Sequence, residues 1–312
     1  MFFVVNIHFG EKMNRTVIVI GSLGMLGWEV VESLKTAGFA VAALDIPQID
    51  ITKRESVQSV LDRIDSPRLL INCAAYTAVD MAESEPEAAF AANRDGPANL
   101  ARECERLGMP LIHISTDYVF NGKSDRPYKE EDAADPINVY GLSKWQGEKA
   151  VRSGLSDHII VRTSWLYGAR GQNFVKTMLR LGAEREELKV VCDQYGCPTW
   201  SFDLAGCLTK IAERIDSGVE TVPRGTYHFC GAGITTWYDF ASTILDEARR
   251  RLPSRIAGVS PVPTDSYPTA ALRPRYSALD CGKIDATLGI TPPPWEKSLA
   301  CLMDEFFGGK HE

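Results

Sequence analysis

The sequence predicts an α/β protein in which a doubly wound parallel sheet precedes a smaller C-terminal substrate domain. The first half of the chain alternates short apolar runs with segments of helical periodicity. These runs are apolar throughout, so each is expected to form a strand that is buried on both faces. From about Gly168 the pattern loosens into short mixed segments with more proline and glycine. We therefore expect a regular sheet first and an irregular domain after it.

The strands and helices of the first half follow in a regular order. The helix after the first strand ends in a glycine, and the next is expected to begin at a capping box, Thr52-x-x-Glu55. A long helix is expected from Ser84 to Gly108, and a later one carries Tyr140. Strands separated by helices form a Rossmann-type parallel sheet with both faces covered. The expected strands are 16–21, 40–45, 68–75, 110–116 and 158–165.

The domain boundaries follow from the same pattern. Residues 1–12 form an N-terminal extension before Met13, without the basic leading region or cleavage site of a signal peptide. Residues 13–168 are expected to bind NAD(P), with the chain returning to this domain around 195–230. Residues 169–312 form mainly the substrate domain, which includes an amphipathic helix in "TTWYDFASTILDEARRRL" and an extended stretch in "PTDSYPTAALRPRYSALD".

Composition excludes several classes of protein. The chain has 34 basic and 41 acidic residues, and its net charge of −7 argues against binding nucleic acid or an anionic membrane. No apolar run reaches the length of a membrane span. Eight cysteines are scattered without a CxxC motif or a Cys/His cluster. We expect reduced thiols in a cytoplasmic protein, without a zinc site.

A glycine-rich turn follows the first strand. Gly21, Gly24 and Gly27 give G-x-x-G-x-x-G, which allows a tight turn and lets a helix N-terminus face a pyrophosphate. Asp45 ends the second strand, where a carboxylate accepts hydrogen bonds from a ribose diol and disfavours a 2′-phosphate. Asp50 is expected to flank the adenine or to cap the next helix. The turn predicts a dinucleotide site, and Asp45 favours NADH.

Three side chains form a candidate catalytic group. Thr116 ends the fourth strand, and Tyr140 and Lys144 are spaced to share one face of a helix. The charge of Lys144 is expected to lower the pKa of Tyr140, so that Tyr140 gives a proton to a carbonyl oxygen as hydride reaches the carbon. Lys144 is also expected to hold the nicotinamide ribose, and Thr116 to polarise the same carbonyl.

Several longer stretches, in order over nearly the whole chain after Met13, carry a more specific pattern. They are "GSLGMLGWE", "INCAAYTAVDMAESEPE", "STDYVFNGKSDRPYKEEDAADPINVYGLSKWQGEKA", "VRTSWLYG", "NFVKTMLRL", "DQYGCPT", "TTWYDFA" and "YPTAALRPRYSALD". The chain thereby resembles the dTDP-4-dehydrorhamnose reductases, a family of extended short-chain dehydrogenase/reductases. The resemblance implies reduction of the 4-keto group of a dTDP-deoxysugar by NADPH or NADH.

The resemblance also implies roles for residues at matching positions. They are Thr116, Tyr140 and Lys144 for catalysis, Gly24, Met25 and Leu26 in the phosphate loop, Asp45, Asp50 and Ile51 at the adenosine, Ala75, Tyr76 and Thr77 along the cofactor, and Asp117 and Trp165 at the deoxysugar nucleotide. Without the resemblance, Trp165 is equally well explained by core packing.

Three further residues are candidates for the nucleotide diphosphate. They are Asn173 and either Arg273 or Arg275, since an arginine fork pairs with two phosphate oxygens. A salt bridge between domains or at the surface explains the arginines nearly as well.

Members of the family are often described as Mg²⁺-dependent, with acidic ligands at a dimer contact. Glu29 and Glu296 are weak candidates for such ligands here. Trp200 and Phe202 stand where an acid is expected, which weakens a magnesium site and metal-mediated dimerisation. A monomer and a homodimer both remain open.

Two other functions remain open. A related nucleotide-sugar epimerase or another 4-ketosugar reductase would share the fold and the candidate catalytic group. A non-catalytic regulatory subunit would share the fold alone, and the intact group of Thr116, Tyr140 and Lys144 argues against it.

Overall fold

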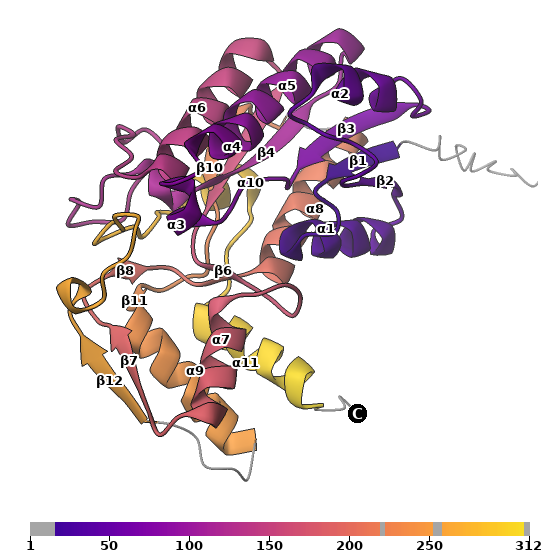
Figure 1. Cartoon of the computed structure of the whole chain (residues 1–312). Helices are drawn as coiled ribbons and strands as arrows, with labels where there is room; N and C mark the ends of the chain where they lie inside the picture. The colour runs from indigo at the N-terminus through magenta and orange to yellow at the C-terminus, as the bar shows by residue number, and fades with distance from the viewer. Residues whose placement is uncertain (1–15, 219–221, 252–257, 309–312) are drawn as a thin grey trace, which may run out of the picture.

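The structure is a computed structural model that describes residues 16–218, 222–251 and 258–308. The expected N-terminal extension, residues 1–12, lies outside the described residues. Figure 1 shows a layered α/β region and, below it in that view, a second region of helices and short strands.

A six-stranded sheet forms the centre of the first region. All its strands run parallel, in the order β10-β5-β4-β3-β1-β2, so the predicted fold class is confirmed. The third strand ends at Asn72, earlier than expected. The strands are β1 (Thr16–Ile20), β2 (Ala40–Leu44), β3 (Pro67–Asn72), β4 (Leu111–Thr116), β5 (His158–Thr163) and β10 (Gly225–His228).

Helices cover both faces of this sheet (Figure 1). Successive strand side chains point to opposite faces, so Val17 and Val19 of β1 enter one apolar cluster, whereas Ile18 and Ile20 enter another. The first cluster includes residues of α1 (Met25–Thr36), α8 (Ser201–Ser217) and α10 (Gly282–Leu288). The second includes residues of α2 (Arg54–Leu61), α5 (Gly96–Leu107) and α6 (Val139–Gly154).

The long helix expected between Ser84 and Gly108 is present in three consecutive parts. They are α4 (Pro86–Phe90), a π-helical turn (Ala91–Asp95) and α5, and the short α3 (Val79–Ala82) precedes them. The helix ends at Gly108, whose φ of +62° is a left-handed conformation that glycine adopts without strain.

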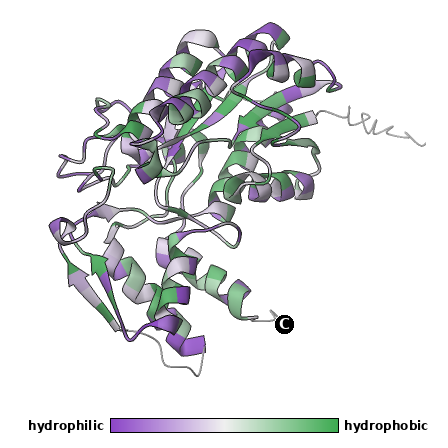
Figure 2. Cartoon of the chain, viewed as in Figure 1, coloured by the Kyte–Doolittle hydropathy of each residue, from purple (hydrophilic) through white to green (hydrophobic). Residues whose placement is uncertain are grey.

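The second region packs around an apolar cluster of its own. Its helices are α7 (Phe174–Glu184), α9 (Trp237–Arg251) and α11 (Trp295–Phe307), and β7 (Glu187–Val191) pairs with β12 (Gly258–Val262). In Figure 2 its helices, like those around the sheet, carry both hydrophobic and hydrophilic residues, as expected for one buried face. Two small sheets join the regions: β6 (Leu166–Tyr167) with β9 (Thr199–Trp200), and β8 (Tyr195–Gly196) with β11 (Thr235–Thr236).

The predicted capping box at Thr52 is wrong. Helix α2 begins at Arg54, and its N-cap residue, Lys53, makes no side-chain cap. The Thr52 hydroxyl instead donates to Asp50 Oδ1 at 2.6 Å. The nearby carboxylate therefore competes successfully for the hydroxyl that the sequence pattern assigns to the helix.

Within the three described ranges, no helix combines the length and the apolar character that crossing a bilayer requires.

Candidate active site

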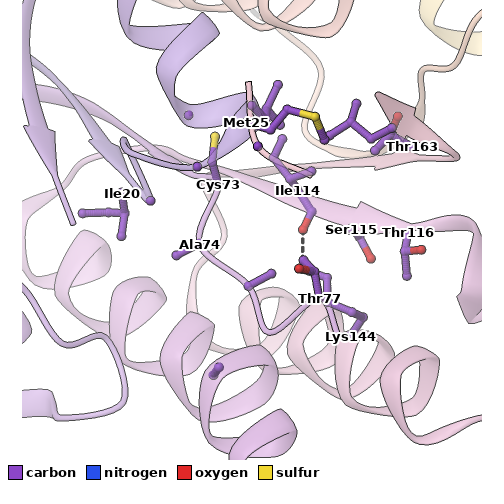
Figure 3. Close-up of a pocket in the computed structure, with 18 of the residues that line it drawn as sticks. Ile20, Met25, Cys73, Ala74, Thr77, Ile114, Ser115, Thr116, Lys144 and Thr163 are labelled. Carbon is purple, nitrogen blue, oxygen red and sulfur yellow. Dashed lines mark hydrogen bonds between the residues drawn. The ribbon is translucent and has the colours of Figure 1, made fainter. Parts of the chain in front are cut away.

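A cavity of about 670 Å³ lies at the carboxyl edge of the parallel strands (Figure 3). We call it the sheet-edge cavity. Ligands of open α/β sheets bind at this edge. Most residues predicted to form a site line this cavity: Gly21, Gly24, Met25, Leu26, Gly27, Asp45, Asp50, Ile51, Ala75, Thr77, Thr116, Asp117, Tyr140, Lys144 and Trp165.

The glycine turn brings three backbone segments closer together than side chains would permit. Gly21 has a φ of +77°, and a Cβ there would lie 2.6 Å from the backbone nitrogen of Ala74. A Cβ on Gly27 would lie 2.0 Å from the carbonyl oxygen of Gly21. Helix α1 then starts at Met25 after Gly24, which makes no side-chain cap. The first backbone N–H groups of α1 are therefore available to a phosphate.

Two carboxylates beside the turn are already engaged. Asp45 Oδ2 accepts from the Leu23 N–H and Oδ1 from the Ile46 N–H, both at 2.8 Å, so Asp45 fixes the glycine turn. Asp50 accepts from Thr52 and pairs with Lys53 at 3.0 Å. A carboxylate has about four acceptor positions, so both residues keep capacity for a ribose hydroxyl.

Tyr140 and Thr116 both line the cavity. Helix α6 starts with Asn138 as N-cap, whose side chain accepts from the Gly141 N–H at 2.7 Å. A Cβ on Gly141 would lie 2.1 Å from the Tyr118 carbonyl oxygen, so glycine lets α6 approach the turn after β4. Burial raises the pKa of Tyr140 to about 12, and a hydrogen bond with the Thr116 hydroxyl opposes the shift. The phenol is therefore held in its protonated form.

Lys144 is buried under the end of β4. Its Nζ donates to the Ile114 carbonyl oxygen at 2.6 Å, drawn as a dashed line in Figure 3. Burial lowers the pKa of Lys144 to about 8, and the charge of Glu148 opposes this shift. The prediction that Lys144 lowers the pKa of Tyr140 is wrong in this structure. Burial is the largest influence on the pKa of the Tyr140 phenol, and the Lys144 ammonium donates to a backbone carbonyl instead.

Asp117 is a buried carboxylic acid in the cavity wall. Its side chain is 2% exposed, and Oδ1 accepts from the Thr116 hydroxyl at 3.0 Å. Oδ2 is buried and has no hydrogen-bond partner in the described part of the chain. Burial raises the pKa of Asp117 to about 7. An unpaired buried oxygen at this position suits a polar group of a ligand.

Four of the residues predicted to contact cofactor or substrate do not line the sheet-edge cavity: Tyr76, Asn173, Arg275 and Arg273. The Tyr76 hydroxyl donates to Glu85 Oε2 at 2.8 Å. Asn173 caps α7, accepting from the Lys176 N–H at 3.2 Å and donating to the Gly168 carbonyl oxygen at 2.8 Å. The side chain of Arg275 is exposed. Their predicted ligand contacts stay predictions.

Arg273 lines a second cavity, of about 550 Å³, between α7, α9 and the segment 267–273. We call it the second cavity. Arg273 makes a two-point ion pair with Asp80, with Nη2 to Oδ2 at 2.7 Å and Nη1 to Oδ1 at 3.2 Å. This is the salt bridge that the sequence left open. The guanidinium is only partly buried and keeps donors for a further anion.

Two kinds of functional residue escaped the sequence analysis. Asp80 and Trp237 belong to stretches noted for their family pattern, but their partners lie far away in the chain. Glu148 sits four residues after Lys144 and is fully buried. It accepts from Ser115 at 2.6 Å and from Arg162 Nε and Nη2 at 2.8 Å each. The i, i+4 spacing from Lys144 was the available signal.

The donors for a magnesium ion are not assembled here. In the part of the chain that the structure describes, no three His, Cys, Asp or Glu side chains are grouped to hold a metal. Glu29 is 8% exposed, and burial raises the pKa of its carboxyl. Glu296 lies in the first turn of α11. These residues do not fit a magnesium site.

Comparisons with known proteins agree with this geometry. A family model described as "RmlD substrate binding domain" matches residues 15–307. The chain is 44% identical to a dTDP-4-dehydrorhamnose reductase of Aggregatibacter actinomycetemcomitans, over 90% of this chain and 96% of the relative. It is 40% identical to the enzyme of that name from Escherichia coli, over 93% of this chain and 98% of the relative.

A solved structure is similar along its whole length. The dTDP-4-dehydrorhamnose reductase of Bacillus anthracis, in complex with NADP, superimposes with a TM-score of 0.86. The two chains are 39% identical, and the match covers 94% of this chain and 100% of the other.

Proposed function

This chain belongs to the dTDP-4-dehydrorhamnose reductase family, and from that premise we propose how its residues carry out the reaction. The enzyme reduces the 4-keto group of dTDP-4-dehydro-β-L-rhamnose to dTDP-L-rhamnose with NADPH or NADH. This is the last step in the synthesis of a sugar donor for cell-surface polysaccharide. The observation that carries the proposal is the group formed by Tyr140, Thr116 and Lys144 at one cavity wall.

The residues of the sheet-edge cavity fit a nicotinamide dinucleotide. Gly21 and Gly27 leave a cradle that any Cβ would fill, and α1 presents free N–H groups there. Asp45 would receive the adenosine ribose, and Asp50 and Ile51 would flank the adenine. Lys144 would hold the nicotinamide ribose through the ammonium hydrogens that it does not donate to the Ile114 carbonyl oxygen. The bound, reduced cofactor supplies the hydride.

Tyr140 supplies the proton. The raised pKa keeps its phenol protonated at neutral pH, and an alkoxide is a strong enough base to take that proton. Thr116, hydrogen-bonded to Tyr140, orients the phenol; its single hydroxyl hydrogen now points to Asp117 and would turn to the carbonyl oxygen when substrate binds. Lys144 adds a positive charge below pH 8, which favours the negative charge that develops on the oxygen.

The substrate would extend from the sheet-edge cavity into the second cavity. Trp165 provides an apolar wall for the deoxysugar, and Asp117 accepts from a sugar hydroxyl through its unpaired oxygen. Arg273 binds the diphosphate in the second cavity, since a guanidinium suits phosphate oxygens. Asn173 and Arg275 are weaker candidates for the nucleotide, because neither lines a cavity described above.

We also propose the setting of the reaction. Residues 13–168, with the return around 195–230, form the cofactor domain, and 169–312 form mainly the substrate domain. All eight cysteines are free thiols, which fits the cytoplasm. We propose a monomer or homodimer, without metal-mediated assembly.

An absorbance assay at the nicotinamide band tests the function. Purified protein is offered dTDP-4-dehydrorhamnose with NADPH and with NADH, each with and without a chelator. We expect substrate-dependent loss of the reduced cofactor in at least one pair, unchanged by the chelator. If the reduced cofactor is not consumed even at high protein concentration, the proposed reaction is wrong. If it is consumed only without the chelator, the reaction depends on a metal.

A further inference from the structure

Trp165 has an unusual backbone conformation for a large side chain. Its φ is +44°, and among the described residues Ser66 is the other non-glycine residue with a positive φ. The left-handed region is unfavourable for bulky residues, and such a conformation persists only where neighbours hold it. The contacts around Trp165 therefore indicate what fixes it.

Trp237 covers one face of the Trp165 ring. The two ring centroids lie 3.5 Å apart, and the ring planes differ by 5°. Trp237 is itself held by Phe174, whose ring centroid lies 4.5 Å away at an angle of 52°. The stack therefore rests on the apolar cluster of the second region.

Gly196 lies against the same ring. A Cβ on Gly196 would lie 2.3 Å from Cε2 of Trp165, so the backbone lies directly against the indole. Gly196 belongs to β8 and pairs with Thr235 of β11, and Trp237 follows β11 directly. One small antiparallel sheet therefore presents both supports of Trp165.

The stacked pair also stands between the two cavities. Trp165 lines the sheet-edge cavity and Trp237 lines the second cavity. Under the proposed function, the sugar and the nucleotide of one substrate meet at this wall.

We propose that Trp237 and Gly196 are positioning residues, which hold the Trp165 indole so that it forms the wall for the deoxysugar. This inference rests on the proposed function. Because Trp237 occupies one face of the indole, a 6-deoxyhexose with its apolar methyl group packs against the part left open to the sheet-edge cavity. The pair thus selects the sugar class and aligns its carbonyl with Tyr140.

Circular dichroism tests the geometry without substrate. Two indoles in van der Waals contact couple excitonically, and we expect a couplet from this pair, which is the tryptophan pair in contact among the described residues. We expect the couplet to disappear in Trp237→Ala and in Gly196→Ala, which keeps both indoles. Trp28→Phe removes a distant indole and should leave it unchanged. A couplet that survives in Gly196→Ala would overturn the role of Gly196.

Kinetics test whether Trp237 acts through Trp165. We expect Trp165→Ala and Trp237→Ala each to lower kcat/KM for the ketosugar roughly tenfold, with the NADPH dissociation constant unchanged. Trp237 also lines the second cavity, so kcat/KM is first corrected for any change in dTDP affinity. After that correction the double variant should be no worse than Trp165→Ala alone, because Trp237 then has no indole to support. Trp237→Phe retains an aromatic face, so it should keep most of the wild-type activity. If Trp237→Ala does not fold, Trp237→Phe combined with Trp165→Ala provides the same comparison.

Two outcomes separate this inference from the proposed function. If the fold-losses in kcat/KM of the two single variants multiply in the double variant, Trp237 does not act through Trp165. That result would overturn its positioning role but not the proposed reaction. If the wild-type protein shows the couplet but does not reduce the ketosugar, the stacked pair is present but the proposed function is refuted. The proposed selection of a deoxysugar is then refuted too.

Discussion

The sheet-edge cavity and the second cavity differ in what forms their walls. The nucleotide end of the first is shaped by backbone: Gly21, Gly27 and the start of α1 leave a space that added Cβ atoms would fill. The second is shaped by side chains, among them Trp237 and the ion pair of Arg273 with Asp80. A backbone site recognises a feature common to all dinucleotides, whereas a side-chain site can be tuned to one sugar nucleotide.

The largest expected effect lies at Tyr140 in the sheet-edge cavity. Tyr140→Phe removes the proton donor but keeps the ring, so we expect kcat to fall roughly 10²- to 10⁴-fold, the usual contribution of a general acid. NADPH affinity should be unchanged, as measured by fluorescence titration. A variant with near wild-type turnover would exclude Tyr140 as the donor.

A smaller loss is expected from the second cavity. Arg273→Ala removes charge-assisted hydrogen bonds to the diphosphate, worth about 1.5–3 kcal/mol, so KM for the sugar nucleotide should rise roughly ten- to hundredfold. Arg275→Ala is the matched comparison, because its side chain is exposed and lines neither cavity. Steady-state kinetics should separate the two, and equal increases would refute the choice of Arg273.

Cofactor affinity should fall when a single methyl group is added to the glycine turn. Gly27→Ala places a Cβ 2.0 Å from the Gly21 carbonyl oxygen, so the turn must shift. We expect the NADPH dissociation constant to rise roughly tenfold, since a loss of about 1.4 kcal/mol has that effect. The control is Gly206→Ala in α8, where a Cβ meets nothing within 4 Å. Similar affinities in both variants would show that the tight turn is not needed.

The smallest effect is a pH dependence from Lys144. Its pKa is lowered from 10.5 to about 8, so its charge is present below that pH and is lost as the pH rises through it. The profile of kcat/KM should therefore fall by half near pH 8. Lys144→Arg stays charged, so its profile should lack this decline at high pH. Its overall rate should be lower than that of the wild-type protein. A decline that begins only near pH 10.5 would contradict the buried setting of Lys144.

The sequence allowed most of the sheet-edge cavity to be predicted. Gly21 follows β1, Asp45 follows β2 and Thr116 ends β4, and parallel strands bring their carboxyl ends to one edge. Local spacing was sufficient because the sheet supplies the long-range order. The direction of the Tyr140 pKa shift was not predictable, since burial of the phenol depends on the complete fold.

The second cavity was much less predictable. Asp80 and Arg273 are 193 residues apart in the chain, and no local pattern pairs them. Thr52 shows the same limit over a short distance: its pattern predicts a helix cap, but Asp50 takes the hydroxyl. Side-chain partners depend on which groups compete nearby in three dimensions, whereas strand and helix positions depend on periodicity.

The central claim is that backbone at the glycine turn of the sheet-edge cavity holds the cofactor pyrophosphate, whereas the Arg273 side chain in the second cavity holds the diphosphate of the sugar nucleotide. Calorimetric titration of Gly27→Ala and Arg273→Ala, each with dTDP and with whichever of NADPH and NADH the wild-type protein binds more tightly, tests it most directly. We predict that Gly27→Ala weakens cofactor binding and leaves dTDP binding at the wild-type level, and that Arg273→Ala does the reverse. If either variant weakens both ligands equally, the two cavities do not divide the work in this way.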